Sequence, residues 1–195
     1  LPFIERFKNK TTTIVYGSSW PEDEAVYIDF INTTTKSVKH IIAPHNINKH
    51  HVEKLKKSIT KSVLLYSQMP DKKLENYDVF IIDSIGLLTK IYSYADISYV
   101  GGAFKTGLHN TLEPATFGTP IIIGPKYHKF QEAIDLVNLK GIMVINSKTE
   151  YQDTLEKLID SEKLRTTTGN INKTYVAQKA GATMKTMTLL KKLHP

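Results

Sequence analysis

Short runs of β-branched and aliphatic residues alternate along the chain with longer stretches in which apolar side chains recur every three or four residues. The short runs are typical of strands buried on both faces, and the longer stretches are typical of amphipathic helices. The pattern predicts strands at residues 11–16, 38–43, 62–67, 79–82, 97–100, 121–123 and 142–145. It predicts helices at residues 22–32, 48–59, 86–94, 110–117, 129–138 and 150–159, with a closing helix at about 172–193.

Buried strands that alternate with helices predict an α/β fold, a Rossmann-like doubly wound parallel sheet with helices on both faces. Ligands in such folds bind beyond the carboxyl ends of the strands. This rule directs attention to four loops, at residues 17–21, 44–48, 83–88 and 101–110.

Composition narrows the class of protein. The chain has 195 residues, 41% of them hydrophobic, and no cysteine. We therefore expect one domain with a sizeable core, without disulfides, a thiol nucleophile or a cysteine-bound metal. Its longest apolar runs are only a few residues, which predicts a soluble domain without a membrane-spanning helix. The chain begins at Leu1 with no leader pattern, so we expect it to be part of a longer protein.

The formal charge of +7 raises the question of an anionic partner. Arginine occurs only at Arg6 and Arg165, and no aromatic residues are interleaved with the lysines as a base-stacking surface requires. We therefore expect no nucleic-acid partner and favour solvated lysine faces. If the basic surface has a function, an anionic membrane surface is a further candidate partner. The lysines are spread along the chain, for example Lys54, Lys56, Lys57 and Lys61, and later Lys185, Lys191 and Lys192.

The strongest candidate site follows the strand at 97–100. Gly101 and Gly102 allow a ligand to approach the backbone closely, and the helix expected from Asn110 would present free N–H groups to a phosphate. Glu113 has two interpretations. It completes a capping box with Asn110, or it binds the two hydroxyls of a ribose. Pro114 disfavours a regular first turn, so both interpretations stay open.

Two other loops have the same ambiguity. Ser18 and Ser19 precede a helix start with acidic residues, which suits an anion or an ordinary serine cap. The turn containing Ile85, Gly86 and Leu87 suits contact with a base or a plain connection. No Gly-x-Gly-x-x-Gly follows the first strand and no P-loop lysine is present, which disfavours dinucleotide and P-loop sites.

The histidines give no metal signature. His50 and His51 are adjacent and would point in different directions on a helix, so they cannot share a metal ion. His45 follows a strand end on the ligand side, and His109 adjoins the expected phosphate-binding helix start. We therefore expect no metal and no cofactor.

Together these motifs resemble the carboxyl-terminal half of GT-B glycosyltransferases, and more narrowly the 3-deoxy-D-manno-octulosonic acid (Kdo) transferases. The most specific match is the run Gly101-Gly102 followed by His109-Asn110-Thr111-Leu112-Glu113-Pro114-Ala115. In the same order along the chain stand Gly17-Ser18-Ser19 with its acidic residues, Ala43-Pro44-His45, and Ser84-Ile85-Gly86-Leu87-Leu88.

The resemblance implies transfer of Kdo from CMP-Kdo to a lipid A precursor at the cytoplasmic face of the bacterial inner membrane. Residues 1–195 would be a single donor-binding domain. An amino-terminal domain outside this chain would bind the acceptor, associate with the membrane and supply the general base. The chain alone would then bind donor without turnover.

Carried over residue by residue, the resemblance implies that Asn110 and Glu113 engage phosphate and ribose, and that the turn at 85–88 contacts cytosine. Lys105 would add positive charge near the phosphate or the sugar carboxylate. The remaining residues expected to line the cleft are Ser18, Ser19, Pro44, His45, Gly102 and His109.

The sequence departs from the family pattern at three loops. Trp20-Pro21 stands where the family has Thr-His or similar, Leu87 replaces an acidic residue, and Asn46 occupies a position where arginine is common. Two alternatives therefore remain. One is another sugar-nucleotide enzyme of similar fold, such as a UDP-sugar transferase or epimerase, and the other is a non-catalytic module. Preference for CMP, for UDP or for neither distinguishes the three.

Overall fold

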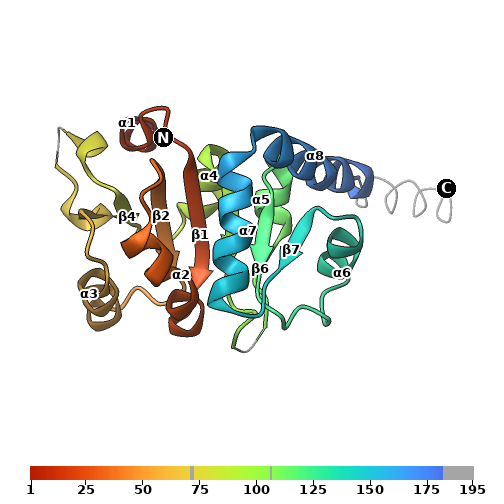
Figure 1. Ribbon diagram of the computed structural model, residues 1–195, viewed down its shortest axis with the longest axis horizontal. Helices are drawn as coiled ribbons and strands as arrows, with labels where there is room; N and C mark the ends of the chain where they lie inside the picture. Colours follow the sequence, from red (N-terminus) through yellow and green to blue (C-terminus); the bar gives the residue numbers. More distant parts are fainter. Residues whose placement is uncertain (71–72, 106, 182–195) are drawn as a thin grey trace, which may run out of the picture.

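A computed structural model describes residues 1–70, 73–105 and 107–181, which form an α/β structure around a single sheet (Figure 1). Within those residues the sheet has seven strands in the order β3-β4-β2-β1-β5-β6-β7, and all six neighbouring pairs are parallel. The prediction of a doubly wound parallel sheet is therefore confirmed. The strands are β1 (Thr13–Ser19), β2 (Lys39–Pro44), β3 (Val63–Leu65), β4 (Val79–Ile81), β5 (Ile97–Val100), β6 (Ile121–Ile123) and β7 (Ile142–Val144).

Helices cover both faces of the sheet, and Figure 1 shows α7 running alongside β1. One face packs against α2 (Pro21–Thr33), α3 (Lys49–Ser58) and α7 (Lys148–Asp160). The other face packs against the remaining helices and short 3-10 turns. These are α1 (Pro2–Lys8), η1 (Tyr66–Gln68), η2 (Leu74–Asn76), α4 (Leu88–Ile91), η3 (Tyr92–Tyr94), α5 (Leu112–Thr116), α6 (Gln131–Asn138) and α8 (Glu162–Lys179).

The central strand β1 shows why the apolar runs are continuous. Ile14 and Tyr16 contribute to the core under α2 and α7, whereas Val15 contributes to the core under α1 and α4. Successive side chains of a strand point to opposite faces, so a strand covered on both faces needs apolar residues at every position. All three side chains are fully buried.

The structure differs from the sequence prediction at several element boundaries. β1 continues to Ser19 instead of ending at residue 16, because it lies between two strands: Gly17 pairs with Val100, and Ser19 pairs with Pro44. The predicted helix at 86–94 consists of the short α4 followed by η3. The helix expected at 110–117 is shorter in the structure, since α5 begins at Leu112.

The prediction for the chain's last helix is confirmed over residues 172–179 but places its start ten residues too late. α8 begins at Glu162, where the Ser161 side chain accepts a hydrogen bond from the Leu164 N–H, and ends at Lys179. Residues 182–193 of the predicted helix, with Lys185, Lys191 and Lys192, lie outside the described residues. Helix α1 was not predicted, although its Ile4 and Phe7 are fully buried.

Among the described residues, the structure has no helix with both the length and the apolar character needed to cross a bilayer.

Candidate functional site

The four loops singled out in the sequence all follow carboxyl ends of strands in one parallel sheet, and so lie along the same edge. The order of the sheet has a switch point beside β1, because β2 lies on one side of it and the later strand β5 on the other. Crevices form at such a point, where connections leave in opposite directions. The loops after β1 and β5 therefore flank the expected ligand position.

Glycines allow the two central loops to approach each other closely. A Cβ atom on Gly101 would lie 2.4 Å from the carbonyl oxygen of Ser18, and one on Gly17 would lie 1.8 Å from the Tyr92 hydroxyl. Ser18 adopts a left-handed φ of 54°. The β1–α2 turn and the start of the β5–α5 loop are thus in direct backbone contact.

The β5–α5 loop, of which Gly101–Lys105 and Gly107–Asn110 are described, folds back on its own start. Gly102 has φ 96°, and its carbonyl oxygen accepts the N–H groups of Lys105 and Gly107, each at 3.1 Å. The Gly102 N–H donates to a carboxylate oxygen of Asp23 at 2.9 Å. Thr106, in the same predicted loop, lies outside the described residues.

Three aromatic rings from three different loops meet at this edge. Trp20 Nε1 donates to His109 Nε2 across 3.0 Å, and the His45 ring stacks on both of them at centroid distances of 4.3 and 4.6 Å. Burial lowers the pKa of His109, and the nearby His45 lowers it further, while Asp23 acts in the opposite direction. The rings join the loops after β1, β2 and β5.

Lys105 already has partners at this edge. Its ammonium lies 4.5 Å from the centre of the Trp20 ring and 3.3 Å from a carboxylate oxygen of Glu22. Both side chains of the ion pair are partly exposed. Such pairs are weak in water, so the lysine can turn toward a bound anion at small cost.

The structure excludes one of the two interpretations of Glu113, its role in a capping box. A capping box with Asn110 does not form, because the residue preceding α5 is Thr111 and its side chain makes no capping hydrogen bond. Asn110 instead accepts the Leu112 N–H at 3.0 Å and donates from Nδ2 to Glu113 Oε1 at 3.2 Å. The other oxygen of Glu113 accepts the Thr89 hydroxyl at 2.8 Å. The carboxylate of Glu113 is partly exposed and connects α4, through Thr89, with the β5–α5 loop, through Asn110.

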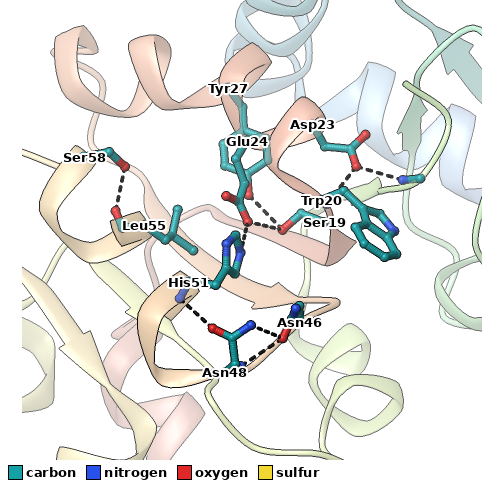
Figure 2. Close-up of polar contacts among 11 residues, drawn as sticks. Ser19, Trp20, Asp23, Glu24, Tyr27, Asn46, Asn48, His51, Leu55 and Ser58 are labelled. Atoms are coloured by element: carbon teal, nitrogen blue, oxygen red, sulfur yellow. Dashed lines mark hydrogen bonds and ion pairs between the residues drawn. The ribbon is translucent and has the colours of Figure 1, made fainter. Parts of the chain in front are cut away.

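The other predicted residues differ in what they present at this edge. The Ile85 side chain is 84% exposed beside Gly86, which has φ 87°, while Leu87 is half-buried. Pro44 is buried and pairs with Ser19 as the last residue of β2. The Ser19 side chain points inward, where it accepts the Tyr27 hydroxyl at 3.0 Å (Figure 2). Ser19 therefore has only backbone groups to offer a ligand.

Two of the acidic residues in the first turn of α2 are buried. Asp23 is fully buried and Glu24 is 5% exposed. Burial raises the pKa of each carboxyl group, and hydrogen bonds oppose the shift. The helical spacing could have indicated that Asp23 is buried. Asp23 lies three and seven residues before the buried Val26 and Phe30, which places it on the same face of α2.

Side chains suited to metal binding do not gather at this edge. Within residues 1–70, 73–105 and 107–181 no three His, Cys, Asp or Glu side chains lie close enough together to hold a metal ion. The groups present at the edge suit an anionic ligand with hydroxyls and a planar ring: backbone amides, an ammonium, a carboxylate and aromatic faces.

Comparison with known proteins was made with both sequence and structure. No protein-family model matches the chain. The 3-deoxy-D-manno-octulosonic acid transferase of Chlamydia muridarum is 34% identical over 157 residues, which is 78% of this chain and 36% of the relative. The enzyme of the same name from Rickettsia bellii is 33% identical over 171 residues, or 83% of this chain and 39% of the relative. The chain thus spans less than half the length of these relatives.

Solved structures share the fold. The C-terminal CMP-Kdo binding domain of WaaA from Acinetobacter baumannii superposes with a TM-score of 0.75 and 18% identity, over 91% of this chain and 98% of that domain. The Anabaena protein HepE, solved in complex with UDP-glucose, has a TM-score of 0.68 and 13% identity, over 98% of this chain and 52% of its own.

Proposed function

Since the chain belongs to the 3-deoxy-D-manno-octulosonic acid transferase family, we propose that it is the donor-binding half of a GT-B enzyme that transfers Kdo from CMP-Kdo to a lipid A precursor in lipopolysaccharide biosynthesis. In this proposal residues 1–195 form one domain. The parts of the relatives that this chain does not cover bind the acceptor and supply the general base.

The observation that carries the proposal is the meeting of the four loops at the switch-point edge of the sheet. Residues from four separate segments, chosen for their likeness to the family's motifs, come to one edge of a fold shared with a CMP-Kdo binding domain. A fold alone does not determine a ligand, so the identity of the ligand depends on these particular side chains.

In the proposed complex, Glu113 accepts hydrogen bonds from the two ribose hydroxyls, and Asn110 contributes at the phosphate. Ile85, Gly86 and Leu87 contact the cytosine ring. The cleft between the central loops is lined by Ser18, the backbone of Ser19, Pro44, His45, Gly102, Lys105 and His109.

The chemistry proposed for this half is stabilisation of the leaving group. The acceptor hydroxyl forms a bond to the anomeric carbon of Kdo, the bond from that carbon to the phosphate oxygen breaks, and CMP departs with the electron pair. The general base takes the hydroxyl proton. Lys105 and backbone N–H groups offset the charge that develops on the departing phosphate. The chain alone then binds donor and does not turn it over.

The proposed setting is the cytoplasmic face of the bacterial inner membrane, with the lipid acceptor held by the uncovered part of the protein. The formal charge of +7 supports this setting, because lysines favour approach to an anionic leaflet.

A second candidate is a GT-B-like enzyme that uses a UDP-sugar. The match to HepE, solved with UDP-glucose, favours it. The two candidates differ in the nucleotide, so calorimetric titration of the chain with CMP, UMP and UDP tests both. Binding of CMP in preference to UMP and UDP supports the Kdo donor, whereas preference for UDP supports the second candidate. Absence of binding by all three contradicts a nucleotide-binding role for this chain.

A further inference from the structure

The first turn of α2 carries two consecutive buried carboxylates with different partners (Figure 2). Asp23 receives three hydrogen bonds of 2.9 Å each. The Tyr99 hydroxyl donates to Oδ1, and the N–H groups of Trp20 and Gly102 both donate to Oδ2. Glu24 instead faces α3, where its Oε1 lies 3.0 Å from His51 Nε2.

The contacts of Asp23 connect the two loops that flank the switch point. Trp20 lies in the β1–α2 turn, and Gly102 is the residue on which the β5–α5 loop closes. One carboxylate oxygen therefore fixes the backbone of both loops at once. Trp20 also contacts both His109 and Lys105 beyond this point, so these side chains at the edge depend on the same anchor.

An ordinary helix cap does not require this arrangement. An acidic residue at the third helical position (N3) can accept the Trp20 N–H while its side chain remains exposed to water. Asp23 makes this hydrogen bond but is fully buried against β5. Burying a carboxylate is costly unless several donors surround it. The Tyr99 hydroxyl and the Gly102 N–H offset the cost of burying this carboxylate. Both donors come from β5 and the loop that follows it, which form the opposite wall of the proposed cleft.

We propose that Asp23 is a positioning residue for the nucleotide donor, which holds the β5–α5 loop in the conformation that binds the phosphate and sugar. The inference rests on the proposed function. Asp23 touches no ligand in this scheme and acts through Gly102 and Trp20.

The neighbouring residues offer matched variants. In Asp23→Ala all three hydrogen bonds are lost. In Asp23→Asn the amide oxygen can still accept both N–H groups, while the amide nitrogen donates to the Tyr99 hydroxyl oxygen. Glu24→Ala removes a buried carboxylate from the same helix turn without touching the β5–α5 loop, so it controls for general destabilisation.

The test is calorimetric titration with CMP, with folding checked by circular dichroism. We expect Asp23→Ala to weaken binding by about tenfold or more, and Asp23→Asn and Glu24→Ala to stay within about threefold of the unmodified chain. Equal affinity for Asp23→Ala and the unmodified chain would overturn the inference. So would an equal loss in Asp23→Ala and Glu24→Ala. If Asp23→Ala does not fold, Asp23→Ser takes its place, because a single shorter hydroxyl cannot serve three donors.

A second measurement separates this inference from the proposed function. If the unmodified chain binds no CMP, the proposed function fails, and hydrogen exchange at the Gly102 amide decides the role of Asp23. Exchange should be faster in Asp23→Ala than in Glu24→Ala, and slow in Asp23→Asn. Slow exchange in Asp23→Ala would show that the loop does not need this anchor.

Discussion

The indole of Trp20 donates its Nε1–H to Nε2 of His109 across 3.0 Å. An indole nitrogen can only donate, so His109 must be unprotonated at Nε2 and carry its proton on Nδ1. Burial, reinforced by His45, lowers the pKa of His109 from its ordinary value of 6.5. The bond between the two central loops is therefore intact at neutral pH and depends on a group whose pKa lies below its ordinary value.

Acid should open this contact. A lowered folded-state pKa means that the stabilisation by neutral His109 is fully present above pH 6.5 and is lost as the pH falls through the folded-state value. Trp20 is the chain's single tryptophan, so its fluorescence reports the change directly. We expect a transition with a midpoint below pH 6.5. His109→Gln should remove it, because a glutamine oxygen accepts the indole N–H without titrating, and a midpoint above 6.5 would contradict the lowered pKa.

Loss of the Glu113 carboxylate should weaken nucleotide binding. A charged hydrogen-bonding group contributes about 1.5–3 kcal/mol, so Glu113→Ala is expected to reduce CMP affinity by roughly 10- to 150-fold in calorimetric titration. Asp153→Ala, which removes an exposed carboxylate of α7, is the control and should bind normally. Unchanged affinity in Glu113→Ala would remove this residue from the proposed site.

His40 should make the fold acid-sensitive. The ring is fully buried, its Nδ1 lies 3.0 Å from the Tyr16 hydroxyl, and burial lowers its pKa to about 3. Stabilisation by the neutral ring is present above pH 6.5 and is lost as the pH falls toward 3, up to about 5 kcal/mol. Urea unfolding at pH 7 and pH 4.5 measures the loss. His40→Gln should show a smaller difference between the two pH values, and an equal difference would contradict the assignment.

Gly102 should tolerate substitution less well than another glycine with positive φ. Gly102→Ala adds a Cβ 2.2 Å from the Gly107 carbonyl oxygen at φ 96°, whereas at Gly118, with φ 71°, the nearest atoms lie at 3.4 Å. A left-handed alanine costs about 1–2 kcal/mol by itself. Gly118→Ala should lose about that much free energy of unfolding, and Gly102→Ala more. Equal losses in denaturant titrations would show that the loop moves aside freely.

The fold was largely predictable because a strand that is buried on both faces appears in the sequence as a continuous run of apolar residues. β5 and β6 have the predicted bounds, and both are uninterrupted buried runs. The start of α8 was placed too late because the first buried residues of this helix, Thr168, Gly169 and Asn172, are small or polar, and the aromatic Tyr175 follows only later. A Cβ on Gly169 would lie 1.8 Å from the Gly118 carbonyl oxygen, so close backbone packing replaces the apolar stripe that sequence analysis looks for.

The site was predictable as a set of loops but not in its internal contacts. The position of β1 and β5 side by side follows from the order of the strands, which local patterns do not encode. Asp23 gains its partners Tyr99 and Gly102 from 76 and 79 residues further along the chain. Local patterns correctly found the helix start but could not show that its acidic residue Asp23 is buried among donors from β5 and its loop.

The order of the strands also has a consequence for synthesis of the chain. Of the seven strands, β1 comes first along the described residues, yet it lies in the middle of the sheet, and its residue Ile14 pairs with Ile97 of β5. During synthesis β2 can pair with one edge of β1 soon after β1 itself, while the other edge of β1 stays unpaired until β5 has been made. An unpaired apolar edge invites pairing with other chains, and long-range closure is slow. The nascent chain is therefore most prone to aggregate during translation of the segment between β2 and β5.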